Sequence, residues 1–304
     1  MSSQTTTTAH PVRPDEPIVR LRHRGRWVAA AALLVLAAMF VHFVVASPEL
    51  RLDLVAGYLF EKSVIEGLVM TLKLTVVSML VGVVLGTVLA IMRLSENPLF
   101  RGVAGGYVWL FRGTPLLVQL LFWFFLGSVL PQISLGVPFG PEFASWPTNT
   151  LITQFTAAIL GLGLNEAAYM AEIVRAGIGS VDRGQAEAAE ALGMSPVTSY
   201  RRVVLPQAAR LIVPPTANQT ISMLKLTSLV LVIGLPELTT TVQLIYGRNF
   251  QQIPLLIVAS VWYLVLTTIL TLVQSRLEKR MSRGVLTRST PVRRKSVFSM
   301  GGRS

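Results

Sequence analysis

No cysteine occurs in the 304-residue chain, which excludes disulfide bonds, zinc sites built on thiolates and cysteine nucleophiles. Histidine is scarce as well, and His10, His23 and His42 are too few and too scattered for a metal cluster. The sequence also lacks a Ser-His-Asp grouping, an HExxH motif and carboxylates at metal-ligand spacing. We therefore expect no catalytic residue, no metal site and no cofactor bound by this chain.

Charged residues are few, at 14% of the chain, whereas hydrophobic residues make up 52% and the mean hydropathy is +0.60. A soluble domain carries about 25% charged residues, so this composition indicates an integral membrane protein. The net charge of +12 could suggest nucleic acid as a partner. However, the basic residues lie mostly in the two tails and between apolar runs, which is typical of membrane topology, and we expect no nucleic-acid partner.

The most prominent feature of the sequence is its long apolar runs. A helix needs roughly 20 apolar residues to cross the hydrocarbon core. By that criterion the sequence predicts six spans, at about 27–46, 64–92, 107–130, 151–176, 211–235 and 254–274. The first run could instead be a signal peptide, but its length favours a retained span. The expected fold is all-α, a polytopic membrane bundle of five core spans plus one additional N-terminal span.

Lysine and arginine concentrate in alternate connections between these spans. Most of them lie in four segments, residues 1–26, 93–106, 177–210 and 275–304. The other connections contain only Arg51, Lys62 and Arg248. The positive-inside rule therefore predicts that both termini are cytoplasmic.

Composition also divides the chain into four expected regions. Residues 1–26 and 281–304 resemble disordered tails, because they are rich in polar residues, proline or arginine. Residues 27–62 would comprise the additional span and an outer loop, and residues 63–280 the main membrane domain.

A charged segment, residues 185–210, separates the fourth and fifth predicted spans. Its first residues suit a helix, and Gly193 follows where a left-handed helix end is expected. Ser195 and Pro196 are typical of an N-cap and a first helical turn, and Pro206 is expected to end this second helix. The segment is thus predicted to be a short cytoplasmic helical hairpin, either a docking element or a simple connection.

Several sequence motifs of this chain resemble the motifs of one protein family. The EAA tripeptide, a glycine after three further residues and VVLP after nine more are similar to the EAA loop of ABC importer permeases. The segments RGTPLLVQ and AYMAEIVR, and the Gly-Gln pair leading into the loop, resemble the polar amino acid permeases among them. The motifs occupy residues 187–189, 193, 203–206, 112–119, 168–175 and 184–185. The resemblance covers about residues 63–280, but neither tail and not the first span.

The resemblance implies a type I importer permease in a bacterial cell membrane, carrying a polar amino acid. Its coupling loop, residues 185–209, would fit a groove on a separate ATPase subunit. An extracytoplasmic solute-binding protein and a second permease, identical or homologous, would complete the assembly. The residues expected to couple transport to the ATPase are Glu187, Ala188, Ala189, Gly193, Leu205 and Pro206.

This chain lacks a phosphate-binding loop of its own. A P-loop needs Gly, four residues and then Gly-Lys-Ser/Thr, whereas Glu61 precedes the one Lys-Ser pair, Lys62-Ser63. ATP and magnesium would therefore bind to the partner ATPase subunits. The alternative is a stand-alone ion-coupled transporter or channel.

Polar residues recur on single helical faces within the predicted spans. An ionisable side chain at membrane depth costs roughly 2.5–3.5 kcal/mol and normally faces protein or a wet cavity. Opposite charges around a cavity would suit a zwitterionic solute, although the same residues could simply fasten helices together. The candidates for a substrate pathway are Asn165, Glu166, Tyr169, Glu172, Asn218, Gln219, Ser222, Lys225 and Ser228.

Four further residues are candidates for a gate or a structural role, namely Arg112, Thr114, Pro115 and Arg175. Thr114 and Pro115 are expected to start the third span, because they match an N-cap and a first helical turn. Gly82 and Gly86 form a Gly-x-x-x-Gly pair, which predicts close packing of two helices.

Overall fold

The computed structural model describes residues 24–47, 50–137 and 142–282, and the chain divides into two units, residues 1–50 and 51–304. The described part of the first unit consists mainly of helix α1 (Arg24–Val45), whose apolar stretch runs from Trp27 to Phe43. This helix overlaps the first predicted span, but its apolar stretch is too short for it to count among the helices that could cross a membrane. The predicted disordered tails lie almost entirely outside the described residues, but their described ends, 24–26 and 281–282, are helical rather than disordered.

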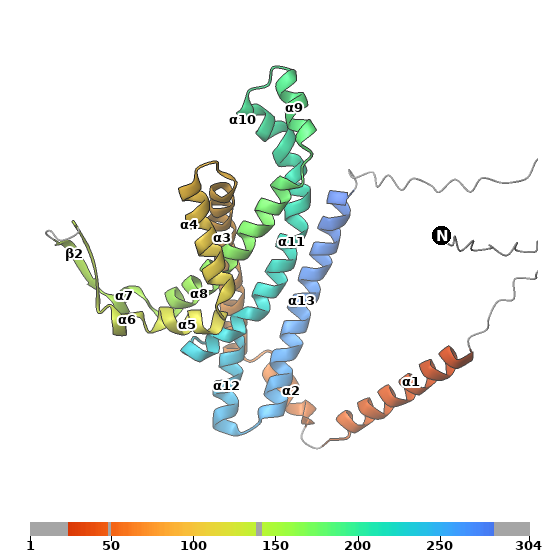
Figure 1. Cartoon of the computed structure of the whole chain (residues 1–304). Coiled ribbons are helices and arrows are strands. Elements are labelled where there is room, and N and C mark those ends of the chain that lie inside the picture. Colours follow the sequence, from red (N-terminus) through yellow and green to blue (C-terminus); the bar gives the residue numbers. More distant parts are fainter. Residues whose placement is uncertain (1–23, 48–49, 138–141, 283–304) are drawn as a thin grey trace, which may run out of the picture. The chain divides into compact units, whose positions relative to one another are not determined.

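The second unit is built almost entirely from helices (Figure 1). The long helices are α3 (Lys62–Leu94), α4 (Pro98–Gly113), α8 (Gln154–Gly179), α11 (Leu205–Leu226), α12 (Leu238–Asn249) and α13 (Gln252–Ser282). The shorter ones are α2 (Leu52–Leu59), α5 (Leu116–Phe124), α6 (Leu126–Val129), α7 (Thr148–Leu151), α9 (Arg183–Ala191) and α10 (Pro196–Ser199). A π-helical turn (Tyr200–Val204) precedes α11, and a 3-10 segment (Thr227–Ile233) follows it.

Within the described residues, four helical runs are long and apolar enough to cross a membrane, or five if one bent pair counts as a span. The four runs are Lys62–Leu94, Gln154–Gly179, Pro196–Ile233 and Gln252–Met281, and the bent pair is α4 with α5. These runs agree with the predicted five-span core of a helical membrane bundle.

The third predicted span begins earlier than expected and is broken in its middle. Helix α4 starts at Pro98, and α4 and α5 meet at an angle of 102°. Thr114 ends α4 and Pro115 precedes α5, so this pair separates two helices and does not start a span. The reason is that proline disfavours helical geometry in the residue before it and offers no N–H to continue the helix.

The expectation for Pro206 was also wrong. This proline lies in the first turn of α11, inside one helical run from Pro196 to Ile233. Just before it the helix widens, and the Leu205 N–H bonds the Tyr200 carbonyl five residues back. Because the hydrogen-bond pattern changes register there, the missing proline N–H does not end the helix.

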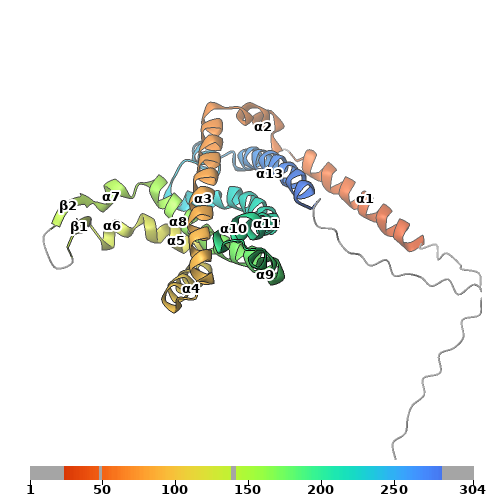
Figure 2. The same ribbon diagram turned by 90° about the horizontal axis from the view of Figure 1, so that it is seen from above.

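One feature departs from the all-helical expectation. Strands β1 (Gln132–Gly136) and β2 (Glu142–Pro147) form a two-stranded antiparallel sheet between α6 and α7. Ile133 lies opposite Trp146, and such a pair of a β-branched and an aromatic residue suits a strand. The hairpin projects away from α3, α8 and α11 (Figure 2).

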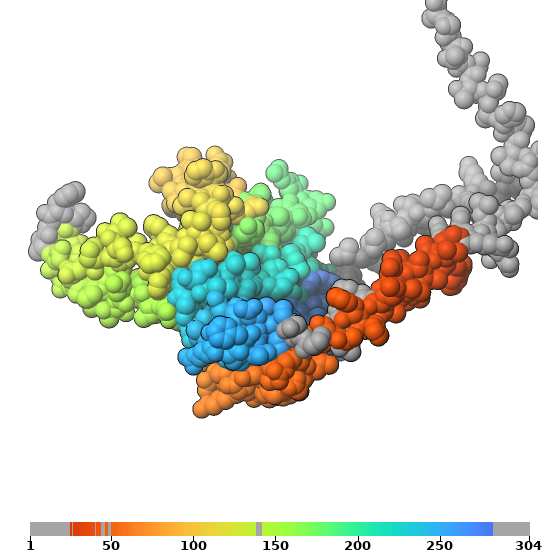
Figure 3. All heavy atoms as spheres, turned by 90° about the horizontal axis from the view of Figure 1, so that it is seen from below, coloured from red at the N-terminus to blue at the C-terminus, as the bar shows by residue number. Residues whose placement is uncertain are grey.

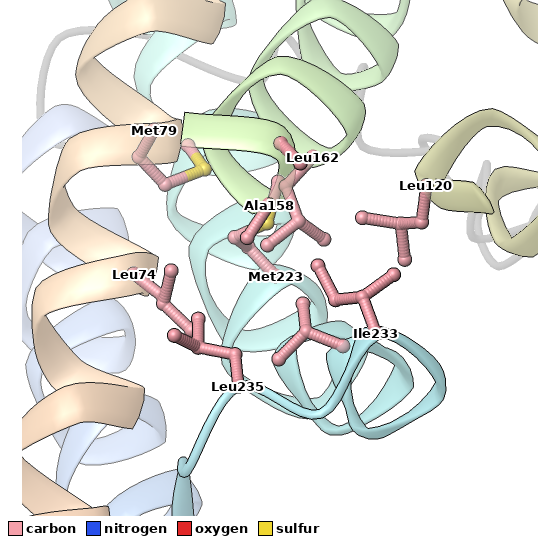
Figure 4. Packing of buried hydrophobic residues seen from close by; sticks show 10 residues of the cluster. Leu74, Met79, Leu120, Ala158, Leu162, Met223, Ile233 and Leu235 are labelled. Carbon is pink, nitrogen blue, oxygen red and sulfur yellow. The ribbon is translucent and has the colours of Figure 1, made fainter. Parts of the chain in front are cut away.

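Apolar side chains from four helices meet in the main core (Figure 4). Leu74, Leu120, Leu162 and Met223, from α3, α5, α8 and α11, are almost fully buried. Ile233 joins this cluster from the 3-10 segment after α11. Lipid tails are as apolar as leucine, so close packing holds such a core together more than exclusion from water does.

Helices α3 and α8 approach closely at the Gly-x-x-x-Gly pair, as the sequence predicts. A Cβ atom at Gly82 would lie 2.5 Å from Glu166 Cγ, and one at Gly86 would lie 2.5 Å from Met170 Cβ. Neither position has space for a side chain. The two glycines therefore set the distance between α3 and α8, and α8 carries four of the nine candidate pathway residues.

Candidate transport site and coupling hairpin

The helical hairpin between α8 and α11 forms as the sequence predicts. Asp182 caps α9 by accepting the Gly184 N–H at 2.8 Å. Gly193 adopts a left-handed φ of 77°, which glycine tolerates best, and its N–H bonds the Glu190 carbonyl at 2.9 Å. Ser195 caps α10 as expected.

Large apolar side chains are exposed on this hairpin, which lies at one end of the second unit (Figure 1). Leu192 is 83% exposed and Val197 77%, and Tyr200 is also exposed. Sequence reasoning did not select Val197 or Tyr200, although an apolar residue in a charged segment was the available signal. Large apolar side chains exposed in a charged segment are suited to contact with another protein or with the membrane surface.

The six candidate coupling residues do not all share this surface. Glu187, Ala188, Gly193, Leu205 and Pro206 are exposed, whereas Ala189 is 4% exposed. Ala189 was predicted to form part of the docking face. Its side chain instead lies inside the hairpin and helps to hold the hairpin together.

The bend between α4 and α5 is held by a polar network. The Asn165 side-chain amide donates to the Phe111 carbonyl at 2.9 Å and to Gln119 Oε1 at 3.2 Å. Gln119 in turn donates to the Phe111 carbonyl at 2.9 Å and to Thr114 Oγ1 at 2.7 Å. Buried Asn165 therefore satisfies the Phe111 carbonyl, which has no N–H partner at Pro115, and holds Gln119 in place.

Replacing Asn165 with leucine is expected to destabilise the bend. Gln119 Oε1 would lose its donor in a buried site, which costs about 1–3 kcal/mol. The measurement is the thermal denaturation midpoint of the purified protein, which should fall. Asn218→Leu is the matched control because Asn218 is exposed. Equal midpoints for the two variants would contradict the structural role of Asn165.

Glu166 and Gln219 connect α8 to α11. The Gln219 side-chain amide lies 3.3 Å from each carboxylate oxygen of Glu166, and Glu166 is 2% exposed. The structure thus brings together two pathway candidates that lie 53 positions apart in the sequence. Their contact joins the helix that precedes the coupling hairpin to the helix that follows it.

Glu172 is surrounded by three arginines. It accepts hydrogen bonds from Arg93 and from Arg175, the latter at 2.8 Å, and Arg112 lies 4.0 Å away. The Arg112 guanidinium also lies over the Tyr169 ring, 5.3 Å from its centroid. The ion pair with Arg175 lies within α8, and α3, α4 and α8 meet at one carboxylate. Sequence reasoning missed Arg93, whose position in the last turn of α3 was the available signal.

The polar side chains of α11 are more exposed to solvent than those of α8. Asn218 and Lys225 are exposed, and Ser222 is partly buried. Lys225 and Ser228 line a cavity of about 390 Å³ with residues of α13, and Lys225 makes no ion pair within the described part of the chain. An unpaired lysine beside a cavity in a spanning helix is suited to an anionic group of a solute.

A fully buried carboxylate, Glu237, was missed by the sequence analysis. It caps α12 by accepting the Thr240 N–H at 2.7 Å, and it accepts hydroxyl hydrogen bonds from Thr71 at 3.3 Å and Tyr263 at 3.0 Å. An acidic residue directly before a helical run was the available signal. These hydrogen bonds connect α3, α12 and α13, so Glu237 fastens the bundle.

The comparisons with known proteins agree with this architecture. The family model of the binding-protein-dependent transport system inner membrane component matches residues 82–283. The arginine transport system permease ArgU of Corynebacterium glutamicum is 47% identical over 272 residues, which cover 87% of this chain and 82% of that protein. The arginine permease ArtQ of Bacillus subtilis is 38% identical over 218 residues, 72% of this chain and 92% of the relative.

The solved structures that resemble this chain also come from ABC transporters. The crystal structure of an amino acid ABC transporter with histidines is 37% identical, has a TM-score of 0.61, and is matched over 72% of this chain and 94% of its own. A chain of the methionine transporter MetNI shares the fold at 20% identity and a TM-score of 0.58. The chain therefore belongs to the family of binding-protein-dependent transport system inner membrane components, the permease subunits of ABC importers.

Proposed function

We propose that this permease imports a polar amino acid and is driven by a separate ATPase that docks on the α9–α10 hairpin. The observation that carries the proposal is the exposed apolar surface of that hairpin, formed by Leu192, Val197 and Tyr200. Because Glu187 and Ala188 are exposed beside it, the surface combines apolar anchors with a charge. The ATPase would hold ATP and magnesium.

The proposed orientation places the hairpin and both termini in the cytoplasm. A solute-binding protein would deliver the amino acid to the opposite end of the bundle, and a second permease copy or a homologous permease would complete the translocation path. The names of the relatives favour a polar substrate, since they include permeases for arginine and for glutamate and aspartate. The buried and open polar faces of α8 and α11 would line the path.

The hairpin connects mechanically to the polar faces. A single helical run leads from α10 into α11, which carries Gln219 and Lys225. On the other side α8 carries Glu166 and leads into α9. A displacement of the hairpin by the ATPase would thus be transmitted to both helices, whose contact at Glu166 and Gln219 lies within the bundle.

Gly193→Pro is expected to abolish uptake and recovery of the ATPase with the permease. Proline fixes φ near −65°, so it cannot adopt the φ of 77° at this turn. Gly193→Ala is the matched control: a Cβ atom there meets nothing within 4 Å, and only the strain of the left-handed backbone, about 1–2 kcal/mol, remains. We expect the alanine variant to keep most of its uptake.

Uptake of labelled amino acids into proteoliposomes, with and without ATP, gives the measurement. Competition by each of the common amino acids identifies the substrate. Uptake that persists without the ATPase and follows an ion gradient would instead indicate a stand-alone ion-coupled transporter or channel. Normal ATPase recovery with Gly193→Pro would contradict docking at the hairpin.

A further inference from the structure

A cavity of about 670 Å³ opens among the end of α2, the first turns of α3, and α12. Figure 1 places these elements at the end of the second unit opposite the coupling hairpin, and Figure 3 views that end directly, with α2 and α3 in orange beside α12 and α13 in blue. The volume falls in the range of small-molecule sites, roughly 300–1,000 Å³. In the proposed orientation this is the extracytoplasmic side.

Charged groups of both signs line this cavity. Glu61 and Glu66 contribute two carboxylates, and Arg248 contributes one guanidinium. Arg248 makes no ion pair within the described part of the chain. Glu66 lies 3.9 Å from Lys62, but the two side chains are 68% and 90% exposed, so water screens this pair and leaves Glu66 available.

Glu61 has an unsatisfied oxygen. Its Oε1 accepts a hydrogen bond from the Ser63 hydroxyl at 3.0 Å, whereas Oε2 is shielded from solvent and has no hydrogen-bond partner. A buried acceptor without a donor costs free energy, and the cost is larger for a charged group. Glu61 also lines the cavity, so a cationic group there would stabilise the carboxylate by charge attraction.

The remaining lining would hold the other parts of a small zwitterion. The Asn249 side-chain amide donates to the Tyr58 hydroxyl at 3.2 Å, which connects α12 to α2 beside the cavity. Met70, Leu244 and Ile245 supply apolar surface. A few placed polar groups on a largely apolar lining are typical of small-molecule sites.

We infer that this cavity is an outer binding site for a cationic amino acid, such as arginine or lysine, separate from the polar face of α11. The two cationic groups of the ligand pair with Glu61 and Glu66, and its carboxylate pairs with Arg248. Two carboxylates and one guanidinium complement two cations and one carboxylate group for group. The inference rests on the proposed function, because it names the substrate class of the same transporter.

The test uses the complete transporter in proteoliposomes, with labelled L-arginine as the probe and the binding protein present. The variants are Glu61→Gln, Glu66→Gln and Arg248→Gln. Loss of one charge-assisted pair corresponds to about a tenfold change in affinity, so we expect the KM for arginine to rise about tenfold with kcat nearly unchanged. Glu142→Gln is the matched control, because Glu142 is an exposed carboxylate in β2 that does not line the cavity.

The outcomes separate this inference from the proposed function. Amino acid uptake by the wild type tests the proposed function alone. Unchanged KM values in all three variants, or a wild type that carries only neutral or acidic amino acids, would overturn the inference while the proposed function stands. If Glu61→Gln fails to assemble, Glu66→Gln gives the same measurement, because Glu66 is exposed. A rise in KM for arginine but not for a neutral substrate supports the site over a general structural defect.

Discussion

Gly86→Leu is expected to prevent this permease from reaching its folded state. A Cβ atom at Gly86 would lie 2.5 Å from Met170 Cβ, 2.8 Å from the Ala167 carbonyl oxygen and 3.0 Å from the Ala171 nitrogen. Two of these atoms belong to the backbone of α8, so a rotamer change cannot relieve the overlap. Helices α3 and α8 would have to separate, and the packing that holds membrane helices together would be lost.

The measurement is the yield of monodisperse protein after extraction from the membrane, which we expect to fall at least about tenfold, since severe overpacking costs several kcal/mol. Gly106→Leu is the control, because Gly106 also lies within a helix but a Cβ atom there meets nothing within 4 Å. Equal yields for the two leucine variants would mean that α3 and α8 do not require this close approach.

Glu172→Gln is expected to destabilise the junction of α3, α4 and α8. The substitution removes the one carboxylate that Arg93, Arg112 and Arg175 share. Three guanidinium groups would then repel one another at the junction of α3, α4 and α8. Breaking a fully buried pair costs about 3–5 kcal/mol. Since Arg112 and Arg175 are 45% and 41% exposed and partly screened, we expect a loss on the order of 1–3 kcal/mol.

The midpoint temperature of thermal denaturation and the rate of ATP-driven uptake should both be lower in this variant than in the wild type. The double variant Glu172→Gln with Arg93→Gln removes one of the repelling charges, so it should be more stable than Glu172→Gln alone. Glu96→Gln is the control, because Glu96 is exposed. If Arg93→Gln lowered the stability of the Glu172→Gln variant by as much as it lowers that of the wild type, the two residues would not interact.

The features that could be read from the sequence are those set by local chemistry. Long apolar runs predicted the spanning helices because hydrocarbon excludes unpaired backbone groups and charges whatever the neighbouring helices are. The turn at Gly193 and the cap at Ser195 were predicted because each depends on residues one to three positions away. The Gly82 and Gly86 pair indicated that two helices pack closely, but it did not identify the partner helix.

The candidate site was predicted less well, because its residues act through distant partners. Asn165 was selected for the substrate pathway, and no local pattern indicated that it also holds the bend between α4 and α5. Glu237 received no prediction, although it binds groups from α3, α12 and α13. A polar residue in a span has the same sequence pattern whether it faces a solute or another helix.

The sequence by itself determined that this chain is a helical membrane protein with a charged helical hairpin, because hydropathy and turn chemistry are properties of short segments. Only the tertiary structure decided that Glu172 meets Arg93 and Arg112, that Glu166 meets Gln219, and that a cavity with charges of both signs lies at the far end. These contacts join residues tens of positions apart. Their geometry depends on which helices pack together, and no local pattern specifies that.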